Sequence, residues 1–211
     1  MARRAKQELE PGVAALAAAD ADFARVVAEL GPPPSRKRDP GFGTLLRAIV
    51  YQQVSTAAGA AIWGRLEAGL GEMHHASLLR HDDEALRGFG LSRPKVKYAR
   101  ALATALADGT LDLDGLHTLE DEAAITALVA LPGIGRWTAE VYLLSALDRP
   151  DVMPAADLAL MVAAQHLKGL PERPTAKQMY ALSEPWRPWR SVAARLLWHY
   201  YRALKNRDPA P

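Results

Sequence analysis

A proline and two glycines interrupt a helical pattern in the stretch LPGIGRWTAEV, residues 131–141. Glycine has no side chain and tolerates positive φ, so the backbone N–H groups of Gly133 and Gly135 can approach a ligand closely. The helix expected from Arg136 adds unpaired N–H donors and the positive end of its dipole. Such groups bind phosphate without reading bases, which is the chemistry of DNA backbone recognition. A plain tight turn with a glycine cap gives the same pattern, so the stretch alone leaves both interpretations open.

The composition excludes several other kinds of site. The 211 residues carry a net charge of +2 and no cysteine, which excludes disulfides, cysteine-ligated zinc and iron–sulfur clusters held by thiolates. The sequences His74-His75 and His81-Asp82-Asp83 lack the spacing of metal ligands, so no metal site is expected there. No run of about 18 apolar residues occurs, and MARRAKQELEPG has no apolar stretch after its charges. We therefore expect a protein without membrane or export segments, intracellular and cytoplasmic.

Basic residues cluster at several places. Arg36, Lys37 and Arg38 are consecutive, and Lys95, Lys97 and Arg100 favour an exposed cationic face on one expected helix. Residues 186–207 contain six basic side chains and no acidic one: Arg187, Arg190, Arg195, Arg202, Lys205 and Arg207. Such clusters suit phosphate binding, but a solvated helix face has the same composition, so charge alone does not decide.

The positions of these residues depend on helices. Apolar side chains recur three and four apart along almost the whole chain, whereas strand alternation and hairpin turns are scarce. The sequence therefore predicts an all-α protein of about eight to ten helices. Thr118 and Asp121 have the spacing of a capping box, and Asp82 or Asp83 suits the N-cap of a short helix. The linker-like residues 31–43 are expected to separate an N-terminal helix from a central helical lobe.

Asp157 precedes the apolar run LALMVAAQHL and suits the N-cap of that helix. The helix dipole keeps a carboxylate at this position ionised. A structural cap and a functional carboxylate are therefore compatible at Asp157.

Three segments together resemble successive blocks of the helix–hairpin–helix (HhH-GPD) DNA glycosylase superfamily. They are LPGIGRWTAEVYLL, DVMPAADLAL and PWRPWRSVAARLLW, in that order, and AIVYQQVSTAAGAAIWGRL resembles the upstream helix and the loop that enters the DNA. The resemblance covers residues 41–204 and is closest to the AlkA-like DNA-3-methyladenine glycosylase branch. The chain is too short and too helical for the N-terminal β-domain of the best-known AlkA-type relatives.

The resemblance implies one glycosylase unit, residues 1–211, of two helical lobes with the active-site cleft between them. The central lobe is expected at residues 41–131. The second lobe, residues 1–40 plus 132–211, is expected to contain the hairpin and the catalytic helix.

The implied activity is hydrolysis of the N-glycosidic bond of alkylated bases, such as 3-methyladenine and 7-methylguanine, in duplex DNA after base flipping. Asp157 occupies the catalytic position of the family. Trp137 and Trp198 match positions that line the base pocket; Tyr142 and Trp189 are further candidates, and for Trp189 core packing is favoured. Strand-cleaving members carry a lysine where Trp137 stands, which implies a monofunctional enzyme without AP-lyase activity.

The resemblance also implies a monomer that acts in base excision repair, close to the nucleoid. Its implied partner is double-stranded DNA that contains damaged bases. Gln53 matches the residue inserted at the flipped-base gap, although a solvated helix-end residue is the alternative. The expected backbone contacts are Gly133, Ile134, Gly135 and Thr138. A structural Na⁺ or K⁺ is implied on the carbonyls of Val129, Leu131 and Ile134, with no other cofactor. Two alternatives stay open: a glycosylase for ethenoadenine, deaminated or oxidised bases, and a non-catalytic DNA-binding module.

Overall fold

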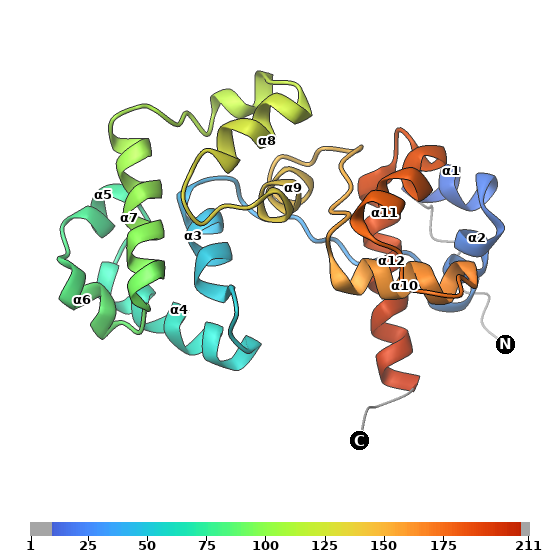
Figure 1. Ribbon diagram of the computed structural model, residues 1–211, viewed down its shortest axis with the longest axis horizontal. Coiled ribbons are helices and arrows are strands. Elements are labelled where there is room, and N and C mark those ends of the chain that lie inside the picture. The colour runs from blue at the N-terminus through green and yellow to red at the C-terminus, as the bar shows by residue number, and fades with distance from the viewer. Residues whose placement is uncertain (1–9, 208–211) are drawn as a thin grey trace, which may run out of the picture. The chain divides into compact units, whose positions relative to one another are not determined.

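The computed structural model describes residues 10–207, and within that range it contains helices and no strand, which confirms the predicted all-α class (Figure 1). The prediction that the first nine residues hold no export signal lies outside the described part. None of the described helices is long and apolar enough to cross a membrane. Contacts divide the chain into two compact units. We call Lys37–Asp148 the central unit; the terminal unit comprises the described residues up to Arg36 and from Arg149 onward.

The central unit is built around α3, whose apolar face (Leu45, Leu46, Ile49 and Val50) is completely buried. This helix packs against α4, α7 and α9, and α8 packs against α9. The elements of the unit are α3 (Phe42–Tyr51), α4 (Thr56–Leu70), α5 (His75–Leu79), α6 (Asp83–Gly88), α7 (Arg93–Ala107), the 3-10 helix η1 (Gly115–Thr118), α8 (Asp121–Val129) and α9 (Arg136–Ser145).

The terminal unit joins both ends of the described chain. Its longest helix, α12, packs against α10, α2 and α1. A partly buried lysine–aspartate contact links two of the other helices: Lys168 at the end of α10 donates to Asp20, the N-cap of α2, at 2.6 and 2.7 Å. The elements are α1 (Pro11–Ala19), α2 (Ala21–Leu30), α10 (Leu158–Lys168), α11 (Ala176–Ser183), the 3-10 helix η2 (Glu184–Trp186) and α12 (Arg190–Arg207).

The helices of residues 10–207 differ from the expected ones in number and in one cap. Twelve α-helices occur there, more than the predicted eight to ten. The sequence does not reveal the short helices α1, α2 and α5, because they lack a long apolar period. Asp82 caps α6 as predicted. The predicted capping box of Thr118 and Asp121 is wrong: Glu120 is the N-cap of α8, and the Thr118 hydroxyl donates to the Gly115 carbonyl within η1.

The two units divide the chain at different places from the expected lobes. The expected boundary after residue 131 separates the hairpin and α9 from α8. In the structure α9 packs against α8 and α3, and the backbone N–H of Gly41 donates to the Tyr142 hydroxyl on α9 at 2.9 Å. These contacts group α9 with the central unit, whereas the lobes as functional divisions stay a prediction.

Candidate functional site

The hairpin between α8 and α9 has the backbone that its glycines predict. Gly133 has φ +86°, and a Cβ added there would lie 2.3 Å from the ring of Tyr98. Gly135 is the N-cap of α9 and offers no side chain to its first N–H groups. A Cβ at Gly135 would meet nothing within 4 Å. The hairpin therefore needs glycine at position 133 for the fold and presents open backbone at position 135.

Side chains of the α3–α4 turn and of the two flanking helices, α8 and α9, hold this hairpin in place. The Gln52 amide donates to the Gly133 carbonyl at 2.8 Å. Arg136 bridges the two hairpin helices, donating to Glu122 on α8 and to Glu140 on α9, each at 3.0 Å. Ile134 is buried at the tip. These contacts fix the hairpin backbone before any ligand arrives, so ligand binding does not have to order it.

A cleft of about 510 Å³ lies beside the hairpin in the central unit. The α3–α4 turn, the start of α7 and the hairpin form its walls. None of its lining residues is acidic: Gln52, Gln53, Ser92, Pro94, Lys95, Tyr98, Gly133, Ile134 and Gly135. The chemistry of this lining favours an anion.

Lys95 is the one basic residue among those that line this cleft. The prediction that Lys95, Lys97 and Arg100 form one exposed face is wrong for Lys95, which is 9% exposed and donates to the Val50 carbonyl at 2.7 Å. Burial lowers the pKa of its ammonium group. Arg100 pairs with Asp83. Alternating charges in PKVKYAR hide this difference, since only the packing of α7 on α3 decides which lysine turns inward.

The turn that carries Gln53 lies beside the hairpin. Gln53 is exposed and has φ +55°, so it projects from the turn rather than continuing α3. Its neighbour Gln52 is the residue that contacts the hairpin, a role that sequence reasoning missed. Two consecutive glutamines give no signal of which one turns inward.

The helix α9 places its predicted site residues on different surfaces. Trp137 is 41% exposed, in the first turn after the hairpin. Thr138 and Tyr142 are buried, and Tyr142 accepts the hydrogen bond from Gly41. Burial raises the pKa of the Tyr142 phenol. Of these three side chains, Trp137 is the one presented to a ligand from the central unit.

Asp157 is the N-cap of α10, as predicted, and its carboxylate accepts a hydrogen bond from the Leu160 N–H at 3.0 Å. The carboxylate is half-buried. The following Leu158 is 56% exposed. The cap thus orients a carboxylate at the positive end of a helix of eleven residues.

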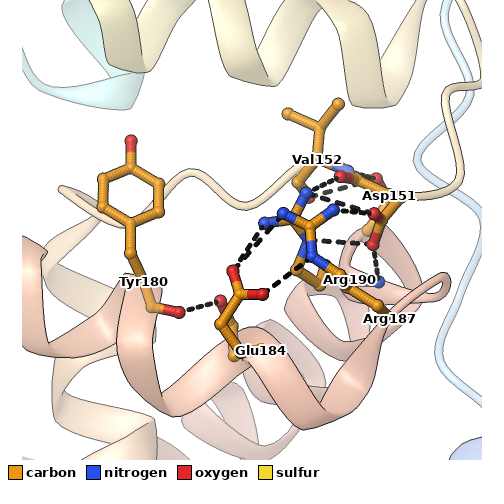
Figure 2. A network of polar contacts seen from close by, with 8 residues as sticks. Asp151, Val152, Tyr180, Glu184, Arg187 and Arg190 are labelled. Atoms are coloured by element: carbon orange, nitrogen blue, oxygen red, sulfur yellow. Dashed lines mark hydrogen bonds and ion pairs between the residues drawn. The ribbon is translucent and has the colours of Figure 1, made fainter.

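The segment that leads to Asp157 is anchored by the start of α12. Arg187 and Arg190 both donate hydrogen bonds to the Asp151 carboxylate, at 2.6 and 2.8 Å. Figure 2 shows Glu184 facing the same two guanidinium groups. The Ser191 hydroxyl accepts from the Val152 N–H and donates to its carbonyl. This network fixes the chain six residues before Asp157.

The same network changes the interpretation of the basic C-terminal stretch. Besides the pairs of Arg187 and Arg190, Arg195 contacts Glu10 at 2.5 Å. Three of the clustered arginines are therefore engaged in ion pairs within the terminal unit. Glu184 is close in sequence, but Asp151 and Glu10 are distant, so the clustering alone could not reveal those two partners.

The two remaining tryptophans among the predicted site residues, Trp189 and Trp198, lie beside and in α12. Trp198 is 7% exposed, and the Arg36 guanidinium lies 4.4 Å from its ring centroid. Trp189 is half-buried against α1, where a Cβ at Gly12 would lie 2.8 Å from its ring. The contact of Trp189 with α1 matches the favoured core packing.

The described residues contain no group of three His, Asp or Glu side chains that could hold a metal ion. The predicted cation ligands are instead three backbone carbonyls at and after the end of α8. One of them, that of Leu131, accepts the turn hydrogen bond from the Ile134 N–H at 3.1 Å. Neutral oxygens of this kind suit a hard monovalent cation.

Comparison with known proteins gives consistent matches. The family model described as HhH-GPD superfamily base excision DNA repair protein matches residues 46–188. DNA-3-methyladenine glycosylase 1 of Schizosaccharomyces pombe is 32% identical over 87% of this chain and 83% of its own length. The probable bifunctional transcriptional activator/DNA repair enzyme AlkA of Mycobacterium tuberculosis is 39% identical over 72% of this chain, which spans 32% of that protein.

Solved structures agree with the sequence matches. The S. pombe 3-methyladenine DNA glycosylase in complex with abasic DNA has a TM-score of 0.81 and 31% identity, over 90% of this chain and 95% of that one. The DNA-3-methyladenine glycosidase of Bacillus halodurans has a TM-score of 0.82 and 33% identity, over 93% and 92% of the two chains.

Proposed function

Because this chain belongs to the HhH-GPD superfamily of base excision DNA repair proteins, we propose that it is a monofunctional DNA glycosylase for alkylated bases. Its substrates are bases of the 3-methyladenine and 7-methylguanine type in duplex DNA, on which it acts as a monomer. The observation that carries the proposal is the structural likeness of this chain to a 3-methyladenine glycosylase bound to abasic DNA, a likeness that covers 95% of that glycosylase.

The proposed reaction is hydrolysis at C1′ of the damaged nucleotide. The C1′–N bond breaks with its electron pair going to the base, and a water oxygen then bonds to C1′ and loses a proton. An alkylated base that carries positive charge leaves as a neutral molecule, so it needs no acid to protonate it. The sugar gains oxocarbenium character, which the Asp157 carboxylate stabilises while it orients the water. The hydrogen bond from Leu160 N supports this role, because it fixes the orientation of the carboxylate.

Recognition of the extruded base is proposed to rest on aromatic faces. A cationic base is attracted to an indole face by about 0.5–2 kcal/mol. Trp137 supports this role by its exposure. Trp198 is the second proposed contact: Arg36 lies over its ring, and a cationic base that displaces this guanidinium gains the same interaction. Tyr142 and Trp189 are proposed to support the fold beside these contacts, since each packs within its own unit.

The hairpin is proposed to bind one phosphate of the DNA backbone through the open start of α9, with Gln53 inserting at the gap of the flipped base. The carbonyls of Val129, Leu131 and Ile134 would hold a Na⁺ or K⁺, which supplies positive charge to that phosphate when bound. The neutral oxygen donors support a monovalent ion.

AP-lyase chemistry is proposed to be absent. It requires an amine nucleophile that forms a Schiff base with the sugar, and position 137 carries an indole instead. The product is therefore an intact strand with an abasic site.

The proposal is tested on duplex oligonucleotides that each carry one defined lesion: 3-methyladenine, 7-methylguanine, ethenoadenine, uracil or 8-oxoguanine. We expect release of the methylated bases, an unbroken product strand before alkali treatment, and no protein–DNA adduct after borohydride. Release of only the other lesions would contradict the substrate assignment. DNA binding without release from any duplex would identify a non-catalytic module.

A further inference from the structure

We propose that the cleft beside the hairpin holds a second phosphate, bound by the Lys95 ammonium and the start of α7. The ligand class is a phosphate oxyanion, and a phosphodiester of the DNA backbone is its expected source. This inference rests on the proposed function, because it extends DNA contact from the hairpin to the opposite wall of the cleft.

The first support is the electrostatics of Lys95. A buried ammonium group is unfavourable unless it is paired. Of its three N–H donors the structure pairs one, with the Val50 carbonyl near the end of α3. The cleft lining offers no carboxylate. Burial correspondingly lowers the lysine pKa. A bound anion would supply the charge partner that the protein does not.

The second support is the position of α7. Its N-cap Ser92 makes no side-chain cap hydrogen bond, so the first N–H groups of this fifteen-residue helix lack that partner. Ser92 and Gly135, the N-caps of α7 and α9, line the same cleft. Two helix starts and one lysine ammonium therefore contribute positive potential to a single cavity.

The third support is the rigidity of the walls. Tyr98, one turn after Lys95 on α7, packs on Gly133 of the hairpin. Gln52 connects the same glycine to the α3–α4 turn. A strand held at both walls would therefore be fixed relative to Gln53, which lines the cleft as well.

The test compares Lys95→Met with Lys97→Met. Methionine is unbranched, apolar and suited to a buried site, and Lys97 is an exposed lysine on the same helix. DNA affinity is measured over a series of salt concentrations, with thermal melting of each variant as the fold control. For Lys95→Met we expect affinity to fall about tenfold or more at low salt. The slope of log K against log salt should shrink by about 0.9, the value for one lost phosphate contact. Lys97→Met should change both much less.

A second arm titrates the wild-type protein and Lys95→Met with inorganic phosphate, followed by the amide signals of Ser92 and Gly135. Loss of phosphate binding together with the smaller slope supports a DNA phosphodiester in the cleft; loss of phosphate binding alone supports a free phosphate. Lower melting temperature with unchanged slope and phosphate binding, or equal effects of the two variants, overturns the proposal. Failure of wild-type protein to bind DNA contradicts the proposed function instead, and the phosphate arm still tests the cleft.

Discussion

The helices α9 and α10 begin in opposite ways. The start of α9 follows Gly135 and has no side-chain cap, whereas the start of α10 is capped by Asp157, whose carboxylate accepts from Leu160. Both starts have N–H groups that no carbonyl of the same helix can accept, and both have the positive end of a helix dipole. The first leaves them for an external anion, and the second has its own anion built in. In the proposed function, one feature of helix geometry thus serves binding in one unit and chemistry in the other.

The two starts are also supported differently. The open start of α9 depends on contacts to its backbone, from Gln52 and from the ring of Tyr98. The closed start of α10 follows a segment held by ion pairs, chiefly those of Asp151. Changes at the first should therefore alter backbone geometry and DNA affinity, and changes at the second should respond to charge.

The largest structural effect is expected from Gly133→Ala. Alanine at φ +86° costs about 1–3 kcal/mol of backbone strain, and its Cβ collides with the Tyr98 ring. We expect a clear fall in the free energy of unfolding, measured with urea, and loss of DNA affinity. The matched control is Gly135→Ala, whose Cβ meets nothing within 4 Å, so its stability should stay close to that of the wild type. Equal destabilisation by both variants would show that the hairpin is not held as described.

A smaller effect is expected from Gln52→Ala, which removes one hydrogen bond to the hairpin. Such a bond contributes about 1 kcal/mol. Its loss should lower the free energy of unfolding by about that amount and make hydrogen exchange at the Ile134 amide faster. Gln53→Ala, at the exposed neighbour, should leave stability unchanged and reduce base release. This division of roles would be refuted if Gln53→Ala lowered stability while Gln52→Ala left stability unchanged and reduced base release.

The smallest effect is expected from pH in the terminal unit. Burial alone would raise the pKa of Asp20, but the hydrogen bond and charge of Lys168, together with hydrogen bonds from the Asp22 N–H and the Trp186 indole, outweigh it, and the pKa lies below its usual 3.8. A carboxyl with a depressed folded pKa stabilises the fold above its usual pKa and loses that stabilisation as pH falls through the folded value. Unfolding free energies measured from pH 7 to pH 2 should therefore decline in acid. The decline should be shallower in Asp20→Asn, and identical profiles would exclude this contribution.

Local sequence signals account for the open and the closed start. Glycine spacing predicts the hairpin, and an aspartate before an apolar run predicts the cap, because both depend on residues within one turn. The inward turn of Lys95 and the contact of Gln52 depend on tertiary packing of α7 and α3, which charge patterning does not encode. The pairing of Arg187 with Asp151, 36 residues earlier, is equally non-local. The proposed catalytic role of Asp157 rests on the family resemblance, since a cap alone implies no reaction.

The division between a binding start and a chemical start is tested most directly by single-turnover base release as a function of enzyme concentration. One such curve gives both the DNA affinity and the maximal rate. Asparagine caps helices about as well as aspartate, so Asp157→Asn keeps the fold while removing the charge. We predict a loss of about 100-fold or more in its maximal rate with unchanged affinity. Gly135→Ala should show weaker affinity with a preserved maximal rate. A normal rate in Asp157→Asn, or normal affinity in Gly135→Ala, would contradict the account.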